Sequence, residues 1–546
     1  MNIAFVSYET PFAPCGGIAA VMARLPARVR AVAHRETVVV TPFHYSIDKM
    51  VTLGHSHEGS FGVPFEGRTV VFHIQRHDVD KLPFFFLLPE DRRFFAGRRH
   101  PYDVPADDLL RDALLFGAAL PRALAVIDPG KRWTMFLQDW EAATAVLATA
   151  DFPGQVRALV TLHNSYDAPV SDERLAAAGI NPQSCPGETV LQRALALTEL
   201  PIFTVSEQFA RDLTEDTLQS QVMAPHLQMI LKPRLRGIDN GPFVDVAVPA
   251  AALASAASGQ LTPLAEWKSA QRQTFVSALA ELKRSPDKPL FGDLQRFVRD
   301  DAPWFVMAGR DDSRQKGYDV AARAAALFLE ANGRGRFLFF PIPGDEGKEG
   351  LEFLRLLAER FPASVLAFPF LFREGFLAAL RGATYGIMPS LYEPFGMGNE
   401  FYLNGTVGIG RATGGIIQQI VPWREAASCG ESVLRRASRC HSPETPPTGL
   451  LFREADGLAT ELDDWRGINA AAYSQTGCQT DRVTERSRFP LYQSMADALR
   501  QALHDASNLA CDHPESYFRL LIDGIAHIQR TFSWDRAAQD YLRHLG

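Results

Sequence analysis

Residues 2–34 read NIAFVSYETPFAPCGGIAAVMARLPARVRAVAH, and this stretch carries the local pattern on which the fold depends. Its first part, residues 2–7, is a short apolar run that predicts a strand, and a turn rich in proline and glycine follows over 11–17. From Ile18 to about His34 apolar residues recur at helical spacing, and Pro26 is expected to bend the helix. The stretch therefore predicts a strand, a glycine turn and a helix in direct succession.

The same succession returns along the chain in altered form. Candidate strands occupy 37–41, 69–74, 133–137, 157–163 and 201–206, and a second series occupies 304–308, 336–341, 364–368, 385–388 and 407–410. Helical patterns lie between many of them, for example over 318–332 and 350–360. Because such apolar runs suit strands that are covered on both faces, the alternation predicts an α/β protein with two parallel, doubly wound sheets.

A change of composition separates the two series of strands. Residues 246–299 are rich in Ala, Ser and Gln and then charged, which predicts a helical connector. We therefore expect a first domain over 1–245, a second over 300–515 and a terminal helix over 516–546. The polar stretches 426–447 and 461–490 are expected to be surface loops or insertions.

The composition excludes several functional classes. The chain has 546 residues, 46% of them hydrophobic and 22% charged, and its net charge is −7. This charge argues against a nucleic-acid binder and against a polybasic membrane anchor. No run approaches the roughly 18 apolar residues that span a bilayer, and the most apolar short run, 82–89, is interrupted by prolines.

The cysteines and the N-terminus point to a cytoplasmic protein. The six cysteines contain no close pair and match no common metal signature, which fits a reduced chain: they are Cys15, Cys185, Cys429, Cys440, Cys478 and Cys511. The N-terminus lacks the basic region that opens a secretory signal.

Loops that follow strands of the second series contain charged residues and glycines. Arg310 follows the strand 304–308, and Lys316 comes just before the next helix, so the two cations could clamp a diphosphate or be solvated surface charges. After the strand 385–388, Glu393 stands before a proline, and Gly396 and Gly398 allow close approach of a ligand to the backbone.

A helix is expected from about Met397 to Gly405, with its N-terminal amides facing an anion and Glu400 in its first turns. A further glycine loop, 413–415, follows the next strand and begins with Thr413. Carboxylates near a helix N-terminus also stabilise a helix without any ligand, so this loop alone leaves both interpretations open.

Loops that follow strands of the first series are individually weaker signals. Gly16 and Gly17 open a helix without forming a dinucleotide-binding G-x-G-x-x-G motif. Asp139 and His163 end strands, and Asn240 lies in the segment Gly-Ile-Asp-Asn-Gly. A lone histidine at a strand end is more often structural than catalytic.

The order of these loops resembles that of bacterial glycogen synthases and plant starch synthases, which are retaining glycosyltransferases of the GT-B fold. The matching segments are collinear over nearly the whole chain: 7–9, 16–17, 139–140, 161–164, 204–206, 237–241, 309–310, 316–317, 389–396, 413–415, 448–452 and 532–538. The resemblance implies two facing Rossmann-like domains with a cleft between them, and a terminal helix that returns to the first domain.

The resemblance also implies roles for individual residues. Arg310 and Lys316 match the basic pair that holds the donor diphosphate, and Glu393 matches an essential glutamate. His163 and Asn240 match residues beside the donor sugar, while Glu9 and Asp139 fall on the acceptor side. The remaining donor contacts are expected from residues of the glycine loops: Gly16, Gly17, Gly396, Met397, Gly398, Glu400 and Thr413.

Three positions depart from the family pattern. Pro14 stands where the family usually has a lysine, and Ala20 stands where an aspartate usually follows. Glu400 lies seven residues after Glu393, whereas related enzymes with two glutamates space them eight apart. These departures indicate a divergent member.

The resemblance predicts transfer of glucose from ADP- or UDP-glucose to the non-reducing end of an α-1,4-glucan. A transferase with a different nucleotide sugar or a small acceptor, and a catalytically silent glucan-binding protein, remain alternatives. The loops that follow strands of the second series contain no Asp-x-Asp pair, and adjacent Asp311 and Asp312 would point to opposite faces of an extended segment. We therefore expect no divalent metal and no cofactor besides the donor.

Overall fold

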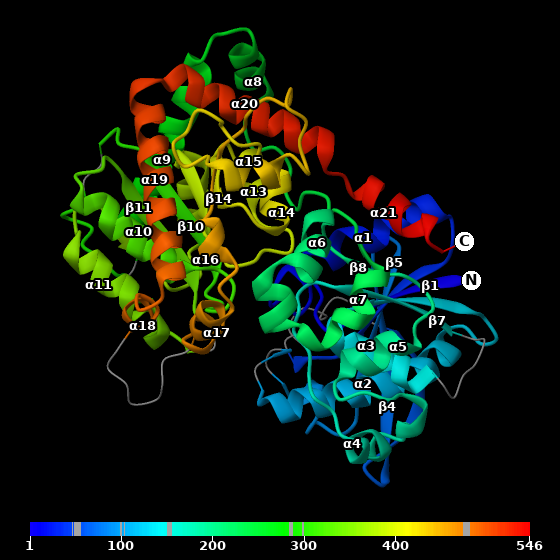
Figure 1. Ribbon diagram of the computed structural model, residues 1–546. Coiled ribbons are helices and arrows are strands. Elements are labelled where there is room, and N and C mark those ends of the chain that lie inside the picture. Colours follow the sequence, from blue (N-terminus) through cyan, green and yellow to red (C-terminus); the bar gives the residue numbers. More distant parts are fainter. Residues whose placement is uncertain are drawn as a thin grey trace. The chain divides into compact units, whose positions relative to one another are not determined.

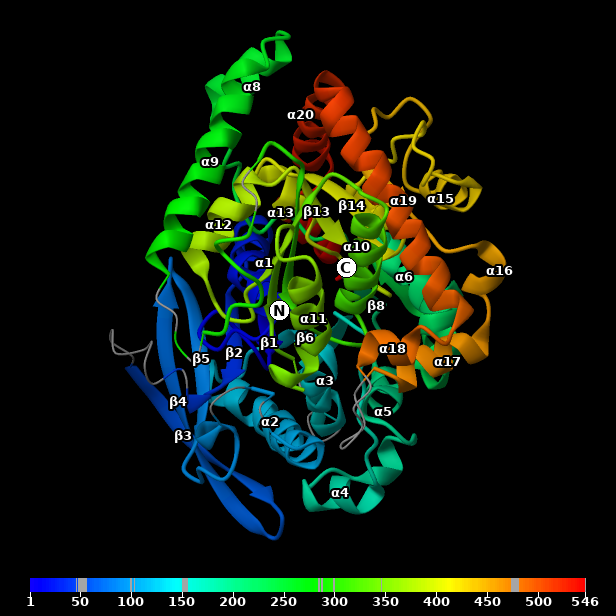
Figure 2. The same ribbon diagram turned by 90° about the vertical axis from the view of Figure 1, so that its left-hand side faces the viewer.

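The computed structural model describes residues 1–45, 47, 56–98, 101–102, 104–149, 156–282, 285, 288–297, 300–344, 346–472 and 481–545. The chain forms two compact units. The first contains Met1–Thr214, Met223–Phe243 and Ser533–Gly546, and the second contains Glu215–Val222 and Val244–Phe532. Each unit has one sheet accompanied by helices (Figures 1 and 2).

The sheet of the first unit has the strand order β3-β4-β5-β2-β1-β6-β7-β8-β9. The strands are β1 (Asn2–Ser7), β2 (Thr37–Pro42), β3 (Ser56–Phe65), β4 (Arg68–Val79), β5 (Leu82–Pro89), β6 (Trp133–Gln138), β7 (Val156–Leu162), β8 (Ile202–Thr204) and β9 (Leu235–Gly237). From β5 to β9 all neighbours are parallel, as the apolar runs predict.

The other edge of this sheet corrects the prediction. β4 is antiparallel to both β3 and β5, so the sheet is mixed rather than purely parallel, and β3 and β5 were not predicted as strands. These long strands are drawn in blue in Figure 2. Pro83 and Pro89 lie near the two ends of β5, where a missing N–H disturbs the ladder least, so the prolines that obscured this strand are compatible with it.

The first unit contains α1 (Gly17–Ala33), α2 (Ala106–Ile127), α3 (Asp139–Ala148), α4 (Asp172–Ala177), α5 (Val190–Leu197), α6 (Glu207–Glu215), α7 (Gln228–Arg234) and α21 (Trp534–Arg543). Short 3-10 turns occur at Phe95–Gly97, Pro182–Ser184 and Pro225–Leu227. A π-helix spans Leu218–Met223, and its residues up to Val222 belong to the second unit. The predicted first helix is confirmed as α1, with Pro26 buried inside it. Its apolar face and α21 share one core cluster with β1.

The sheet of the second unit is entirely parallel, with the order β12-β11-β10-β13-β14-β15. Its strands are β10 (Trp304–Arg310), β11 (Arg336–Ile342), β12 (Val365–Ala367), β13 (Tyr385–Met388), β14 (Val407–Arg411) and β15 (Leu450–Phe452). The five predicted strands of the second series are therefore confirmed, and the doubly wound α/β class is confirmed in both units.

The second unit contains α8 (Ala250–Ala257), α9 (Thr262–Glu281), α10 (Tyr318–Glu330), α11 (Glu352–Arg360), α12 (Arg373–Gly382), α13 (Gly398–Leu403), α14 (Gly414–Gln419), α15 (Glu431–Ala437), α16 (Asp456–Ala459), α17 (Leu462–Ala470), α18 (Arg482–Arg486), α19 (Pro490–Asp512) and α20 (Pro514–Thr531). A 3-10 turn precedes α11 at Glu349–Leu351. No helix among the described residues is both long and apolar enough to cross a membrane.

Two predicted loop regions are corrected by these helices. The stretch 426–447 contains α15, and 461–490 contains α17 and α18, while its residues 473–480, including Cys478, lie outside the described residues. Buried side chains such as Trp465 and Arg486 tie α17 and α18 to the second unit, although their polar sequences resemble loops. The other five cysteines form no disulfide within the part of the chain that the structure describes.

Candidate active site

Glu393 lies in the loop between β13 and α13 of the second unit, and its carboxylate is held by three donors. Oε2 lies 2.7 Å from the Lys316 ammonium and accepts a hydrogen bond of 2.9 Å from the Ser390 hydroxyl. Oε1 accepts a hydrogen bond of 3.2 Å from the Gln315 side-chain amide. Glu393 is 5% exposed, so these contacts fix a nearly buried charge. Ser390 and Gln315 were not among the predicted site residues, and their sequence signal is their position beside residues that were.

A tight turn places Lys316 beside this carboxylate. Gly317 caps α10 with φ of +68°, and a Cβ at this position would lie 2.5 Å from the carbonyl oxygen of Pro389. Only glycine combines this backbone conformation with such close approach. The Leu391 amide also donates to the Gln315 carbonyl at 2.7 Å, so the two loops are joined through their backbones.

Buried arginines of α18 hold the loop that contains Arg310 and Lys316. Arg310 is the exposed last residue of β10, and the next residue, Asp311, accepts two hydrogen bonds from Arg482, at 2.7 and 2.9 Å. Arg486 donates to the Ser313 carbonyl at 2.7 Å and also pairs with Asp319. Asp311, which was considered as a metal ligand, is thus engaged in an ion pair.

The loop 413–415 packs directly against the backbone of Glu393. Thr413 is the N-cap residue of α14 and is buried. A Cβ on Gly414 would lie 1.7 Å from the Glu393 carbonyl oxygen, and the Gly415 amide donates to that oxygen at 3.1 Å. No side chain fits at Gly414, which explains the glycine pair in physical terms.

The helix after Glu393 is shorter than predicted. It begins at Gly398, with Met397 as its N-cap residue and Gly396 just before it, and it ends at Leu403 rather than at Gly405. Glu400 lies in its first turn. The backbone amide of Asn399 already donates to the Gln419 side chain at 2.9 Å, so this amide is engaged within the protein.

In the first unit, the side-chain carboxylate of Glu9 lies at the N-terminus of α1. Its Oε1 accepts hydrogen bonds from the amides of Gly16 at 3.1 Å and Ala19 at 2.7 Å, and Glu9 is only 1% exposed. Gly17, the first residue of α1, is exposed. The buried Glu9 carboxylate therefore lies at the positive end of the helix dipole. The glycine turn was expected to offer its amides to a donor phosphate, but the Gly16 amide already binds Glu9.

Asp139 and His163 are brought together at the ends of β6 and β7. Asp139 accepts hydrogen bonds from the His163 amide at 2.6 Å and from the Asn164 side chain at 3.0 Å. The His163 ring nitrogen Nε2 lies 2.8 Å from Gln138 Oε1, which makes Nε2 the protonated nitrogen. Asp139 has φ of +60°, a left-handed conformation that aspartate adopts more readily than most residues.

Burial sets the charge states of this group. It lowers the pKa of His163 to about 3, so the imidazole is neutral near pH 7. Burial also raises the pKa of Asp139 to about 7, and the nearby Glu9 carboxylate adds to this shift. Burial and the neighbouring Asp139 raise the pKa of Glu141 well above its usual range. Glu141, two residues after Asp139, was not singled out from the sequence.

Asn240 follows β9 and is 3% exposed. Its backbone N–H donates a hydrogen bond of 3.2 Å to the Val205 carbonyl. Its side-chain oxygen is buried without a hydrogen-bond partner among the described residues. A buried acceptor without a donor is costly, which makes this oxygen a candidate for a ligand hydroxyl.

The predicted residues thus form separate groups in each unit. The second unit brings Lys316, Glu393 and the loop 413–415 together, and the first unit brings Asp139 and His163 together and places Glu9 against Gly16. Within the described residues there is no cluster of three or more His, Cys, Asp or Glu side chains suited to a metal ion.

Comparison with known protein sequences shows which proteins this chain is similar to. A family model described as the starch synthase catalytic domain matches residues 2–228. A glycogen synthase of Thioalkalivibrio sulfidiphilus (strain HL-EbGR7) is 25% identical over 563 residues, covering 99% of this chain and 98% of the relative. Glycogen synthase 2 of Agrobacterium fabrum (strain C58 / ATCC 33970) is 28% identical over 368 residues, covering 62% of this chain and 65% of that relative.

Solved structures agree on the fold. The catalytic domain of starch synthase IV from Arabidopsis thaliana, bound to ADP and acarbose, aligns with a TM-score of 0.68 at 18% identity and covers 99% of this chain and 98% of that chain. A UDP-forming α,α-trehalose-phosphate synthase from Burkholderia vietnamiensis aligns with a TM-score of 0.50 at 12% identity, covering 100% and 99%. The chain is thus similar in sequence to glycogen and starch synthases, and the solved structures show that it has the GT-B fold.

Proposed function

We propose that this protein is a retaining glucosyltransferase that moves glucose from ADP-glucose or UDP-glucose to the 4-hydroxyl at the non-reducing end of an α-1,4-glucan. The observation that carries the proposal is the Lys316–Glu393 pair, held at 2.7 Å in loops that follow parallel strands. Ligands of open α/β sheets bind at this end of the strands. The starch synthase IV structure is bound to ADP and acarbose, which supports a nucleotide donor and a saccharide acceptor.

The reaction must stabilise a departing nucleoside diphosphate and a positively charged sugar ring. Arg310 and Lys316 would supply positive charge to the diphosphate, and Glu393 would balance the charge of Lys316 and orient the donor sugar. The bond from the anomeric carbon to the phosphate oxygen breaks, the acceptor hydroxyl oxygen forms the new bond on the same face, and its proton passes to the departing diphosphate. We assign no covalent nucleophile to the enzyme.

Residues of the first unit would contact the two sugars. The unpartnered Asn240 side-chain oxygen would accept a hydrogen bond from a donor sugar hydroxyl. Neutral His163 would offer hydrogen bonds rather than charge, because burial lowers its pKa to about 3. Asp139 would face the acceptor, and Glu9 would shape this side by holding the glycine turn through its amides.

A transferase with a different nucleotide sugar or a small acceptor is the second candidate. Two features of the turn favour it. Glu9 already accepts hydrogen bonds from the Gly16 and Ala19 amides, and Pro14 stands where the family usually has a lysine. In this arrangement the turn offers fewer groups to a donor phosphate.

A matrix of nucleotide sugars against saccharide acceptors, read by mass spectrometry, tests the proposal. We expect glucan chains extended by hexose from ADP- or UDP-glucose, with the new linkage α by proton NMR. Transfer from another nucleotide sugar, or only to a small acceptor, would favour the second candidate. Glucan binding without any transfer would indicate a catalytically silent protein.

We further propose that the enzyme needs no divalent metal and works in the cytoplasm. Arg310 and Lys316 carry two positive charges, one of which Glu393 balances, and we propose that these cations take the place of a metal ion at the diphosphate. Activity should therefore survive exhaustive chelation. Loss of activity with chelator and recovery with magnesium would overturn this part of the proposal.

A further inference from the structure

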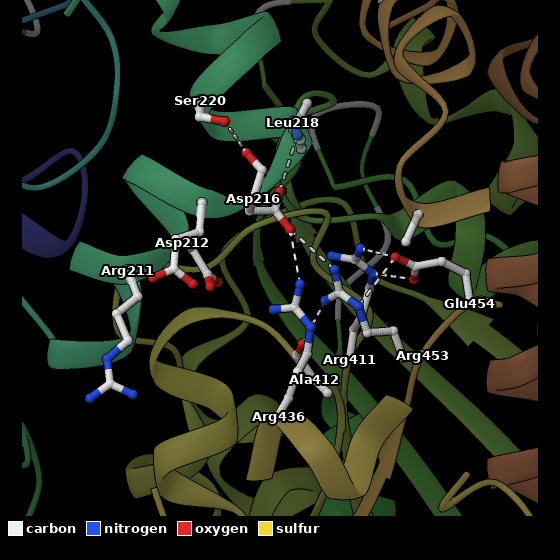
Figure 3. A network of polar contacts seen from close by, with 12 residues as sticks. Arg211, Asp212, Asp216, Leu218, Ser220, Arg411, Ala412, Arg436, Arg453 and Glu454 are labelled. Atoms are coloured by element: carbon white, nitrogen blue, oxygen red, sulfur yellow. Dashed lines mark hydrogen bonds and ion pairs between the residues drawn. The ribbon is translucent and has the colours of Figure 1, made fainter. Parts of the chain in front are cut away.

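A buried network of charges lies where β14 and β15 end in the second unit (Figure 3). Arg411 and Glu454 are both fully buried and form a bidentate pair, with Arg411 Nε at 2.8 Å from Glu454 Oε2 and Arg411 Nη2 bonded to Glu454 Oε1. Burial disfavours the charged carboxylate, yet the neighbouring Arg411 and Arg453 guanidiniums outweigh it and lower the pKa of Glu454 to about 2. The pair therefore stays charged near pH 7.

Arg411 also holds the loop that contains Glu393. Its Nη1 donates a hydrogen bond of 2.6 Å to the carbonyl oxygen of Leu391, two residues before Glu393. One edge of the rigid guanidinium thus binds Glu454, while another donor binds the loop backbone. Glu454 fixes Arg411, and Arg411 fixes Leu391.

Arg453 holds the second backbone segment that touches Glu393. Its Nη1 donates to the Ala412 carbonyl at 2.6 Å, and Ala412 directly precedes the loop 413–415, which contacts the Glu393 carbonyl. Arg453 Nη2 lies 3.1 Å from Asp216 Oδ2, which Arg436 also approaches to 3.4 Å. Figure 3 shows the Asp216 carboxylate directed toward these two guanidiniums.

Stability alone does not account for such a network. Taking these charges out of water costs several kcal/mol per ion, and apolar replacement of a buried pair is often neutral or stabilising. What the network supplies is fixed geometry at two points of backbone beside Glu393. A misplacement of about 1 Å in an active site can reduce turnover by about a hundredfold.

We propose that Arg411 is a positioning residue for catalysis, which holds Glu393 in register through the Leu391 carbonyl. The expected effect on turnover rests on the proposed function, whereas the hold on the Leu391 backbone rests on the contacts described above. Side-chain contacts from Lys316 and Ser390 then orient a carboxylate whose backbone Arg411 has already placed.

The test variant is Arg411→Lys, which keeps the charge beside Glu454 but cannot span both the carboxylate and the Leu391 carbonyl. We expect kcat to fall at least about tenfold while the donor KM changes less than about twofold, because the donor-binding cations remain. We also expect faster amide hydrogen exchange at residues 391–395, with unchanged exchange in β10.

The matched control is Arg193→Lys in the first unit. Arg193 is also buried and donates to the carbonyls of Cys185 and Val170 and to the Asp172 carboxylate. It should lose comparable thermal stability while kcat stays within about twofold of wild type. Equal losses of kcat in the two variants would reduce Arg411 to a structural role and overturn the proposal.

The exchange measurement separates this proposal from the proposed function. If the wild-type protein transfers no sugar from any donor, the proposed function fails, and exchange at 391–395 still decides what Arg411 holds. Unchanged exchange there in folded Arg411→Lys would overturn the inference. If Arg411→Lys does not fold, the paired Arg411→Met/Glu454→Met variant replaces it, with the same expected and contradicting results.

Discussion

At Glu393, one nearly buried carboxylate gathers hydrogen bonds from Lys316, Ser390 and Gln315. Glu393→Gln keeps the shape and removes the negative charge that balances Lys316. We expect turnover to fall at least about a hundredfold, the size typical of one preorganised electrostatic group. The measurement is kcat with the best donor, and circular dichroism checks the fold.

Glu352→Gln is the control for this substitution. Glu352 is a glutamate at the surface of α11 that pairs with Arg355. Its loss should leave kcat within about twofold, because surface ion pairs contribute little. Near-normal turnover of folded Glu393→Gln would remove Glu393 from the catalytic machinery.

His163 predicts a pH dependence of stability. Burial lowers its pKa in the folded protein to about 3, whereas its ordinary value is 6.5, so between these values the unfolded chain binds the extra proton. The His163 contribution to the free energy of unfolding is therefore lost as pH falls from 6.5 toward 3. Urea unfolding should show wild type losing stability relative to His163→Gln across this window.

His163→Gln also loses the contact with Gln138, which changes the free energy of unfolding by a constant amount at every pH. The decisive quantity is therefore how the difference in unfolding free energy between the two proteins changes with pH. A flat difference between wild type and His163→Gln from pH 6.5 to 3 would contradict a buried neutral imidazole. Asp139 is expected to act in the opposite direction, because its raised pKa of about 7 means that stability falls as pH rises toward 7.

Among the elements, α18 is only five residues long, yet its two arginines hold the loop of Arg310 and Lys316. Arg486→Met would leave the fully buried Asp319 carboxylate without one of its partners. We expect a loss of about 3–5 kcal/mol in the free energy of unfolding, as for other broken buried pairs. Chemical denaturation measures this loss.

The double variant Arg486→Met/Asp319→Leu is the control, because it leaves no unpaired charge. It should regain much of the stability lost in the single variant. A loss below about 1 kcal/mol in Arg486→Met would mean that water or Arg482 already compensates Asp319.

The sequence predicted elements where local pattern is sufficient. The apolar runs of β10, β11, β13 and β14 are covered on both faces, so their composition alone marks them as strands. The prediction failed for β3, which is largely exposed and has no apolar run, and for β5, whose apolar run contains prolines. It also failed for α18, because nothing local distinguishes a solvated arginine from one that is buried against Asp311 or Asp319.

The candidate site shows the same division. Resemblance indicated Lys316 and Glu393, but their contact joins residues 77 positions apart, which no local spacing encodes. The engagement of the Gly16 amide by Glu9 likewise depends on how the chain turns after β1. Residue types follow from sequence, whereas partners within the site follow from tertiary structure.

At the scale of the whole molecule, the C-terminal segment completes the core of the first unit. The chain leaves the second unit after Phe532, and Ser533–Gly546 belongs to the first. Trp534 is 7% exposed and its indole N–H donates to the Pro242 carbonyl at 2.8 Å. It shares a cluster with residues of β1 and α1, including Ile3 and Met22.

Truncation after Phe532 should therefore destabilise the first unit and spare the second. Removing Trp534 and the rest of α21 exposes the apolar face of α1, and loss of a buried tryptophan alone costs about 3–5 kcal/mol. Hydrogen exchange should show lost protection in β1, β2 and β6, with β10 and β13 unchanged. Trp534→Phe, which keeps most of the apolar area, is the control and should retain protection in β1. Unchanged exchange throughout the truncated protein would show that the first unit closes its core without α21, and that Trp534 contributes packing that other residues replace.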